Sequence, residues 1–220
     1  MSQEGASRIG VVGAGTIATG LAADLSRISH VRLVARSSAS ADRAAKAVAK
    51  LGARDPAIDP DRISYGTEAA ALTDCTLVVE AIAEELHLKS RLLASLGTVI
   101  GPEALLATTT SSLSTEELAT LSSVPDRFFA LHVFNPVTKM QLVELCFPEQ
   151  ASKSTRELAR KLCERLGKTA VEVPDIAGFV VNRLLFPYLF SAVELLEQTE
   201  LGQAVSSNAT PAPRSVKQRP

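Results

Sequence analysis

Two ionisable residues lie within an apolar stretch near the middle of the chain. The stretch LHVFNPVTKMQLVEL, residues 131–145, places His132 and Glu144 twelve positions apart. Histidine titrates near neutral pH, so it can take or give a proton at a reacting oxygen. A carboxylate beside the ring can orient it and stabilise its cationic form. We therefore expect an acid–base pair at the end of a strand; a histidine that merely packs in the core is the alternative.

A glycine-rich loop near the N-terminus is typical of dinucleotide binding. The segment VGAGTIATGLA, residues 12–22, follows an apolar strand and opens a helix. Gly13 permits the tight turn, and Gly15 lets the backbone approach a pyrophosphate. The free N–H groups of the helix then face the phosphates. A purely structural turn is the alternative. The expected cofactor-binding residues are Gly13, Gly15, Thr16, Ile17 and Ala18.

The end of the second strand indicates which dinucleotide is bound. NAD sites usually carry an acidic residue there that accepts from the ribose hydroxyls, but this chain has Ala35 followed by RSSAS. Arg36 can face a 2′-phosphate with a fixed cationic fork, and Ser37 and Ser38 can donate to the same group. The sequence therefore favours NADP among the NAD(P) cofactors. In the alternative, Arg36 is a solvated loop residue and NAD(H) binds without the usual acid.

The elements that position these residues alternate between strands and helices. Apolar runs without a polar face, separated by helical patterns, predict a parallel sheet covered on both sides. The fold class is thus α/β, a Rossmann-type doubly wound, mostly parallel sheet followed by a truncated all-helical C-terminal segment. The expected strands are 8–13, 31–35, 76–82, 105–110, 128–134, 141–146 and 169–174.

The pattern changes after Pro174, where one long apolar helix begins. Residues 1–174 are expected to form the dinucleotide-binding domain with the His/Glu pair, 175–200 the start of a helical domain, and 201–220 a disordered tail. Pro187 and the polar residues within the helix argue against a membrane span. Its apolar face must be covered by another surface, so we expect a homodimer through this helix; an absent partner segment is the alternative.

Composition narrows the functional classes. The 220 residues are 46% hydrophobic with a formal net charge of −1, which gives no field for nucleic acid or an anionic membrane. The cysteines, Cys75, Cys146 and Cys163, are far apart, unlike a disulfide framework or a zinc ligand set. No metal is expected. The N-terminus has no apolar signal core, so we expect a cytoplasmic protein.

Five motifs together resemble one enzyme family. They are GAGTIATGLA, VVEAIAEELHLK (78–89), TSSLS (110–114), HVFNPVTKMQLVEL (132–145) and DIAGFVVNRLLFPYL (175–189). Their order and spacing, from residue 8 to about 197, are similar to those of the L-3-hydroxyacyl-CoA dehydrogenases of fatty acid metabolism. The histidine and glutamate in their H-x-F-N-P context are more diagnostic than the glycine loop.

The resemblance implies an oxidoreductase that transfers a hydride between a nicotinamide cofactor and C3 of a 3-hydroxyacyl or 3-oxoacyl thioester, bound to CoA or a carrier protein. It implies that His132 is the catalytic base and Glu144 its partner. Ser111 and Asn182 then hold the substrate oxygen. The other residues that it implies are Asn135 in the loop after the catalytic strand, and Glu84 and Lys89 beside the nicotinamide and ribose.

Some of these residues also have structural interpretations. Ser111 could cap a helix, but Ser114 with Glu117 three residues later forms a better capping box. Glu84 and Lys89 could form a solvated helix face. Asn182 in an apolar helix would be a costly buried amide unless something polar faces it.

Three departures from the family leave other functions open. The acidic residue is absent at Ala35, the segment between the second strand and residue 76 is short, and the helical domain is reduced to one helix. The CoA portion could be weakly held or replaced by a carrier protein. The alternatives are a dehydrogenase of a non-thioester hydroxy acid, such as a sugar acid or carnitine, and a truncated dinucleotide-binding module without catalysis.

Overall fold

The computed structural model describes residues 8–198, which divide into two units, 8–179 and 180–198. The strands are β1 (Arg8–Val12), β2 (His30–Val34), β3 (Ile63–Gly66), β4 (Leu77–Glu80), β5 (Leu105–Thr108), β6 (Phe128–Val133), β7 (Leu142–Cys146) and β8 (Thr169–Glu172). The helices of the first unit are α1 (Thr16–Leu25), α2 (Ser38–Gly52), α3 (Leu86–Val99), α4 (Thr115–Leu121) and α5 (Lys153–Arg165), with short 3-10 helices at Pro60–Arg62, Ala69–Leu72 and Pro125–Arg127.

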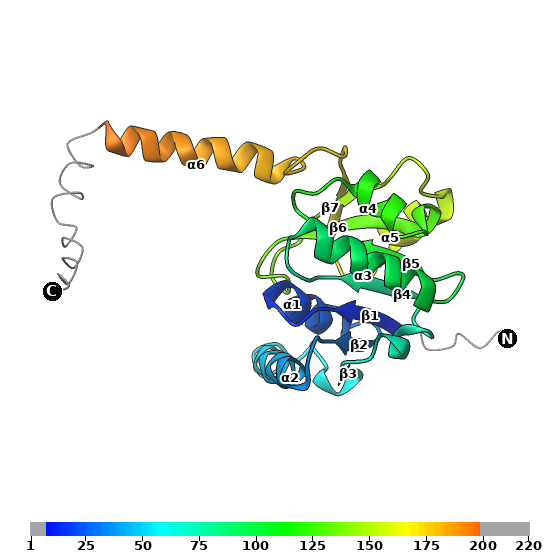
Figure 1. The fold of residues 1–220 in the computed structure, drawn as a ribbon. Helices are drawn as coiled ribbons and strands as arrows, with labels where there is room; N and C mark the ends of the chain where they lie inside the picture. The colour runs from blue at the N-terminus through cyan, green and yellow to red at the C-terminus, as the bar shows by residue number, and fades with distance from the viewer. Residues whose placement is uncertain (1–7, 199–220) are drawn as a thin grey trace, which may run out of the picture. The chain divides into compact units, whose positions relative to one another are not determined.

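The strands form one sheet in the order β3-β2-β1-β4-β5-β6-β7-β8 (Figure 1). All neighbouring pairs are parallel except β6 and β7, which are antiparallel. The strand order reverses between β1 and β4, so this is a doubly wound sheet. Ligands of such sheets bind at the carboxyl ends of the strands near the reversal. The expected α/β fold is confirmed.

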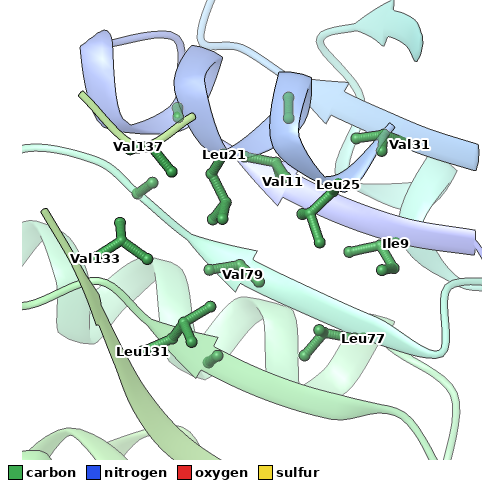
Figure 2. Packing of buried hydrophobic residues seen from close by; sticks show 14 of the residues in the cluster. Ile9, Val11, Leu21, Leu25, Val31, Leu77, Val79, Leu131, Val133 and Val137 are labelled. Atoms are coloured by element: carbon green, nitrogen blue, oxygen red, sulfur yellow. The ribbon is translucent and has the colours of Figure 1, made fainter. Parts of the chain in front are cut away.

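Both faces of the sheet are buried because successive side chains of a strand point to opposite sides. In β4, Val79 packs with α1, α2 and α5 in one cluster, whereas Val78 packs with α3 and α4 in the other. Figure 2 shows the first cluster, in which Leu21 and Leu25 of α1 lie over β1 and β4. This two-sided burial is why the central strands are apolar along most of their length.

The sequence did not reveal β3, which pairs with β2 at the edge of the sheet. Its four residues, ISYG, carry no apolar run, and only Ile63 among them is buried, so the segment lacks the pattern of a buried strand.

The expected helix cap is confirmed, since the Ser114 hydroxyl accepts from the Glu117 N–H at 3.2 Å and α4 begins at the next residue. Asp175 adds to this cap by accepting from the Thr115 N–H at 2.9 Å.

The second unit contains α6 (Val181–Glu197), which carries large apolar side chains and includes Pro187. Within residues 8–198, no helix is both long enough and apolar enough to cross a membrane. The first unit ends at Phe179, a few residues beyond the expected boundary at 174. The tail expected over residues 201–220 lies outside the described residues, and the homodimer through α6 stays a prediction.

Candidate active site

His132 and Glu144 face each other across the antiparallel pair β6 and β7. They are directly opposite in the register, so their side chains point to the same side of the sheet. Nδ1 of His132 lies 2.7 Å from Oε2 of Glu144, a separation typical of a strong hydrogen bond to a carboxylate. The histidine is 6% exposed and the glutamate 2%. The structure thus brings together the two residues that the sequence singled out.

Aromatic side chains enclose the imidazole. The His132 ring is 4.7 Å from the Phe134 ring and 5.4 Å from the Phe179 ring, measured between centroids. These contacts hold the ring plane, and the hydrogen bond between His132 and Glu144 lies in a buried environment, where electrostatic interactions are stronger than in water. Because Nδ1 is engaged with Glu144, Nε2 is the ring nitrogen that can exchange a proton with a bound molecule.

The glycine loop has the geometry that a dinucleotide pyrophosphate needs. Gly13 has φ +135°, and a Cβ there would meet the Ala81 carbonyl oxygen at 2.3 Å, so only glycine fits. At Gly15 a Cβ would meet nothing within 4 Å, so the backbone is open on that side. Gly15 begins α1 without a side-chain cap, and the first turn holds no acidic residue. The uncapped N–H groups are therefore available to phosphate oxygens. The residues present fit a dinucleotide, and the small Ala18 is fully buried behind the loop.

The end of β2 lacks a carboxylate, as the sequence indicates. Ala35 is buried, and its N–H donates to the Gly66 carbonyl at 2.8 Å. Arg36 is exposed. The Ser37 hydroxyl accepts from the Ser40 N–H at 3.3 Å and so caps α2. Of the groups expected to bind a 2′-phosphate, the Ser37 hydroxyl is thus shared with the helix cap, and Arg36 faces solvent.

Ser111 lies at the same edge of the sheet as His132. Thr108 at the end of β5 pairs with Ala130 of the parallel strand β6. Ser111 follows Thr108 by three residues and His132 follows Ala130 by two, so both lie toward the carboxyl ends of these strands. Oε1 of Glu84 accepts from the Ser111 N–H at 2.8 Å, the Ser112 N–H at 3.0 Å and the Thr110 hydroxyl at 2.6 Å. Glu84 therefore orders the segment 110–112 that carries the serine.

The charge of Glu84 is maintained by this arrangement. Burial raises the pKa of the carboxyl, but the hydrogen bonds from Thr110 and Ser111, the positive charge of Lys89 and the Ser112 hydroxyl together lower it to about 2. Glu84 is thus an anion at any physiological pH. Its side chain is about one third exposed.

Lys89 is not part of a solvated helix face. It is fully buried, and its Nζ lies 2.8 Å from Oε1 of Glu80 and 3.3 Å from Oε2 of Glu84. This places Glu84 and Lys89 in one ionic network that reaches from β4 to the segment after β5. Their contact with a cofactor stays a prediction.

A groove of about 550 Å³ opens between the glycine loop, α2 and the segment after β6. Asn135 and Val137 form one wall, and Val137 packs on α1 at Gly20, where a Cβ would lie 3.0 Å from the Val137 Cβ; Figure 2 shows Val137 beside Leu21. Lys168 holds this wall, since its Nζ donates to the Val137 carbonyl at 2.8 Å. The cations lining the groove are Arg43, Lys50 and Arg54.

Three sets of residues were missed in the sequence. Arg43 and Lys50 of α2 follow a helical spacing that could have been noticed, with Arg54 just after the helix, but a basic helix face is usually only solvated. Glu80 had a clearer signal, because a glutamate that ends an otherwise apolar strand requires a buried partner. Lys168 gave no signal in sequence. Asn182 lies in the first turn of α6, in the second unit, and its role stays a prediction.

Comparison with known proteins shows the family. Residues 8–176 match the family model of the 3-hydroxyacyl-CoA dehydrogenase NAD-binding domain. Over 207 residues the chain is 35% identical to the 3-hydroxybutyryl-CoA dehydrogenase of Mycobacterium tuberculosis, a match that covers 86% of this chain and 71% of that protein. It is 43% identical over 137 residues to the mitochondrial hydroxyacyl-coenzyme A dehydrogenase of Mus musculus, covering 62% of this chain and 44% of the relative. In this match, and in a similar one to the probable 3-hydroxybutyryl-CoA dehydrogenase of Deinococcus radiodurans, the chain spans about half the length of the curated relative.

Solved structures agree with this assignment. The crystal structure of Mycobacterium tuberculosis FadB2 superposes with a TM-score of 0.83 at 31% identity, covering 94% of this chain and 79% of the other. The (S)-3-hydroxybutyryl-CoA dehydrogenase PaaH1 of Ralstonia eutropha gives 0.81 at 31% identity, with 94% and 74% covered. With its glycine loop, its paired histidine and glutamate, and these matches, the chain belongs to the 3-hydroxyacyl-CoA dehydrogenase NAD-binding domain family.

Proposed function

We propose that this protein is an NAD(P)-dependent dehydrogenase that interconverts the 3-hydroxy and 3-oxo groups of an acyl thioester. The observation that carries the proposal is the buried His132–Glu144 pair, 2.7 Å apart at the carboxyl edge of a sheet that also presents an open glycine loop. A proton-transfer pair and a dinucleotide cradle on one edge are what oxidation of an alcohol requires.

His132 moves the proton in this reaction. When bound, the nicotinamide cofactor supplies or accepts the hydride at the substrate carbon. Nε2 of His132 takes the proton of the 3-hydroxyl in oxidation and returns it to the 3-oxo oxygen in reduction. Glu144 stabilises the cationic form that the ring has while it carries this proton. Its hydrogen bond with Nδ1 also fixes the tautomer of the neutral ring. The phenylalanine rings around the imidazole keep competing water away.

Ser111 and Asn182 orient the substrate oxygen. Ser111 follows β5 at the same sheet edge as His132. Its hydroxyl has a long hydrogen bond of 3.4 Å to Oε1 of Glu84, and it exchanges this partner for a substrate oxygen that gains charge. Asn182 supplies a second donor from α6, a role that rests on the resemblance of the segment GFVVNR to the family.

The test measures absorbance at 340 nm with acetoacetyl-CoA and either NADH or NADPH. The wild-type chain is expected to oxidise the cofactor, and His132→Gln is expected to bind the cofactor with unchanged affinity but to lose turnover. Full turnover in the variant would contradict the assignment. Cofactor binding by the wild-type chain without turnover on any thioester or free hydroxy acid would instead favour the non-catalytic module.

We further propose that NADPH is preferred over NADH. The support is the absence of a carboxylate at Ala35, together with the exposed Arg36 and the start of α2, whose first turn holds no acidic residue. Replacing Arg36→Ala is expected to lower kcat/KM for NADPH by about tenfold to a hundredfold, the value of one charge-assisted hydrogen bond, and to leave NADH almost unaffected. An equal loss with both cofactors would show that Arg36 does not read the phosphate.

The groove beside the glycine loop is proposed to hold the phosphate-bearing carrier of the acyl group. Arg43, Lys50 and Arg54 line it, and phosphate is the group that such cations recognise. Replacing Lys50→Met and Arg54→Met together is expected to raise KM for acetoacetyl-CoA about tenfold. KM for the short acetoacetyl-N-acetylcysteamine thioester, which has no phosphate, is the control and is expected to stay the same. Equal changes in both values would contradict a role in carrier binding.

The context that we propose is a cytoplasmic homodimer in fatty acid metabolism. Support comes from the apolar side chains of α6, which need a partner surface, and from three buried free cysteines, which suit a reducing compartment. Light scattering on the purified chain is expected to give twice the monomer mass. A monomer at micromolar concentration would contradict the dimer.

A further inference from the structure

Glu80 is a buried carboxylate that the proposed reaction does not use. It ends β4 and is fully buried, although the other three residues of the strand are apolar. Its Oε1 accepts from the Ile82 N–H at 2.7 Å, and its Oε2 accepts from the Thr108 hydroxyl at 2.6 Å. The carboxylate thereby ties the end of β4 to the end of β5, the strand that leads to Ser111.

Lys89 extends this connection to Glu84. Its Nζ donates to both oxygens of Glu80, at 2.8 and 3.0 Å, and lies 3.3 Å from Oε2 of Glu84. A fully buried ammonium is very unfavourable without a carboxylate, so these two partners set where Lys89 lies. Within residues 8–198 they are the carboxylates with which it forms ion pairs.

The two carboxylate oxygens of Glu84 have different partners. Oε2 faces Lys89, whereas Oε1 accepts from the N–H groups of Ser111 and Ser112 and from the Thr110 hydroxyl. The ionic network therefore ends on the backbone of the segment 110–112. The Glu84 side chain makes both interactions. A change in the negative charge around Lys89 is therefore expected to alter the hydrogen bonds to this segment.

We propose that Glu80 is a positioning residue, which acts through Lys89 and Glu84 to hold Ser111 in place for the reaction. The proposal rests on the proposed function, in which the Ser111 hydroxyl donates to the substrate oxygen. Without the charge of Glu80, Lys89 keeps Glu84 as its carboxylate partner. Glu84 then turns toward the ammonium and away from the amides of the segment 110–112, so the serine loses its alignment.

A double-mutant cycle tests this connection with acetoacetyl-CoA as substrate. Glu80→Gln keeps the shape of the side chain, and it is expected to lower kcat about tenfold to a hundredfold, the effect of a misplaced group, with a smaller change in KM. In a Ser111→Ala background the same substitution is expected to change kcat by less than about threefold, because the group that it positions is gone. An equal loss in both backgrounds would overturn the proposal.

Amide hydrogen exchange gives a readout that needs no turnover. Exchange at Ser111 and Ser112 is expected to become at least about tenfold faster in Glu80→Gln, since the acceptor of both N–H groups moves away. Unchanged exchange there would overturn the proposal. Failure of the wild-type chain to reduce any thioester would count against the proposed function alone, because the exchange measurement still decides the role of Glu80.

Two further variants separate positioning from lost stability. Thr155→Val removes a buried hydroxyl that donates to the Asp126 carbonyl at 2.8 Å, away from the network, and is expected to leave kcat and the Ser111 exchange unchanged. Thr108→Val removes one donor to Glu80 and leaves the ion pair intact, but it also removes the acceptor of the Thr110 N–H at 3.3 Å. It is expected to give a smaller effect of the same kind. Should Glu80→Gln not fold, Thr108→Val serves in its place with exchange at Ser112 as the readout, because the Ser112 N–H donates to Glu84 and Thr110. Equal effects of Thr155→Val and Thr108→Val would overturn the proposal.

Discussion

Replacing Glu144→Gln is the substitution that tests the proposed chemistry most directly. The glutamine has the same shape, so the packing around the side chain, which is 2% exposed, is preserved. Two properties are lost, however. The negative charge beside His132 disappears, and the amide can donate to Nδ1, which places the ring proton on Nε2 and removes the base that faces the substrate.

The structure sets the size of the expected effect. The Nδ1 to Oε2 distance is 2.7 Å, and both side chains are almost fully buried. With charge centres roughly 4 Å apart and an effective dielectric constant of about 20, the attraction between imidazolium and carboxylate is about 4 kcal/mol. In the transition state the ring carries much of this charge, so a loss of about a thousandfold in kcat is expected.

The assay compares kcat and KM of the wild-type chain and Glu144→Gln by cofactor absorbance, with His132→Gln as the matched control. KM is expected to change little, because Glu144 is buried behind the histidine and does not face the groove. The double variant is expected to be no slower than His132→Gln, because the two residues act as a unit. A loss below about tenfold in Glu144→Gln, with the fold intact, would refute the electrostatic reasoning.

Three further predictions concern stability and reactivity. Gly13→Ala is expected to lower the free energy of unfolding by at least about 2 kcal/mol, because its Cβ would meet the Ala81 carbonyl oxygen and its φ is positive; denaturant unfolding without such a loss would contradict the turn geometry. Burial raises the pKa of each of the three thiols to about 11, so Ellman's reagent at pH 8 is expected to label no cysteine until the chain unfolds. The pKa of Glu84 is lowered from 4.5 to about 2, so the stability it contributes is fully present above pH 4.5 and is lost as pH falls toward 2. Urea unfolding of the wild-type chain and Glu84→Gln is expected to give a constant difference between pH 5 and 8; a drift within that range would contradict the assignment.

The architecture of the first unit follows from local sequence patterns. Two-sided apolar strands alternating with helices can bury their surfaces only in a covered parallel sheet, and the glycine loop at the first strand-to-helix turn needs no distant contact to form. Local signals of this kind also located the helix cap at Ser114. The edge strand β3 escaped because its short, half-polar segment depends on pairing with β2 for its conformation.

Which distant residues share an environment depends on long-range packing and strand pairing. The register of β6 with β7 sets the 2.7 Å contact between His132 and Glu144, since a slip of one residue would turn one side chain to the other face. Lys89 belongs to a helix that in sequence could be solvated, and folding buries its ammonium between carboxylates from β4 and from the loop just before α3. Burial and charge pairing depend on what the rest of the chain packs around a residue, and the residue type alone does not contain that information.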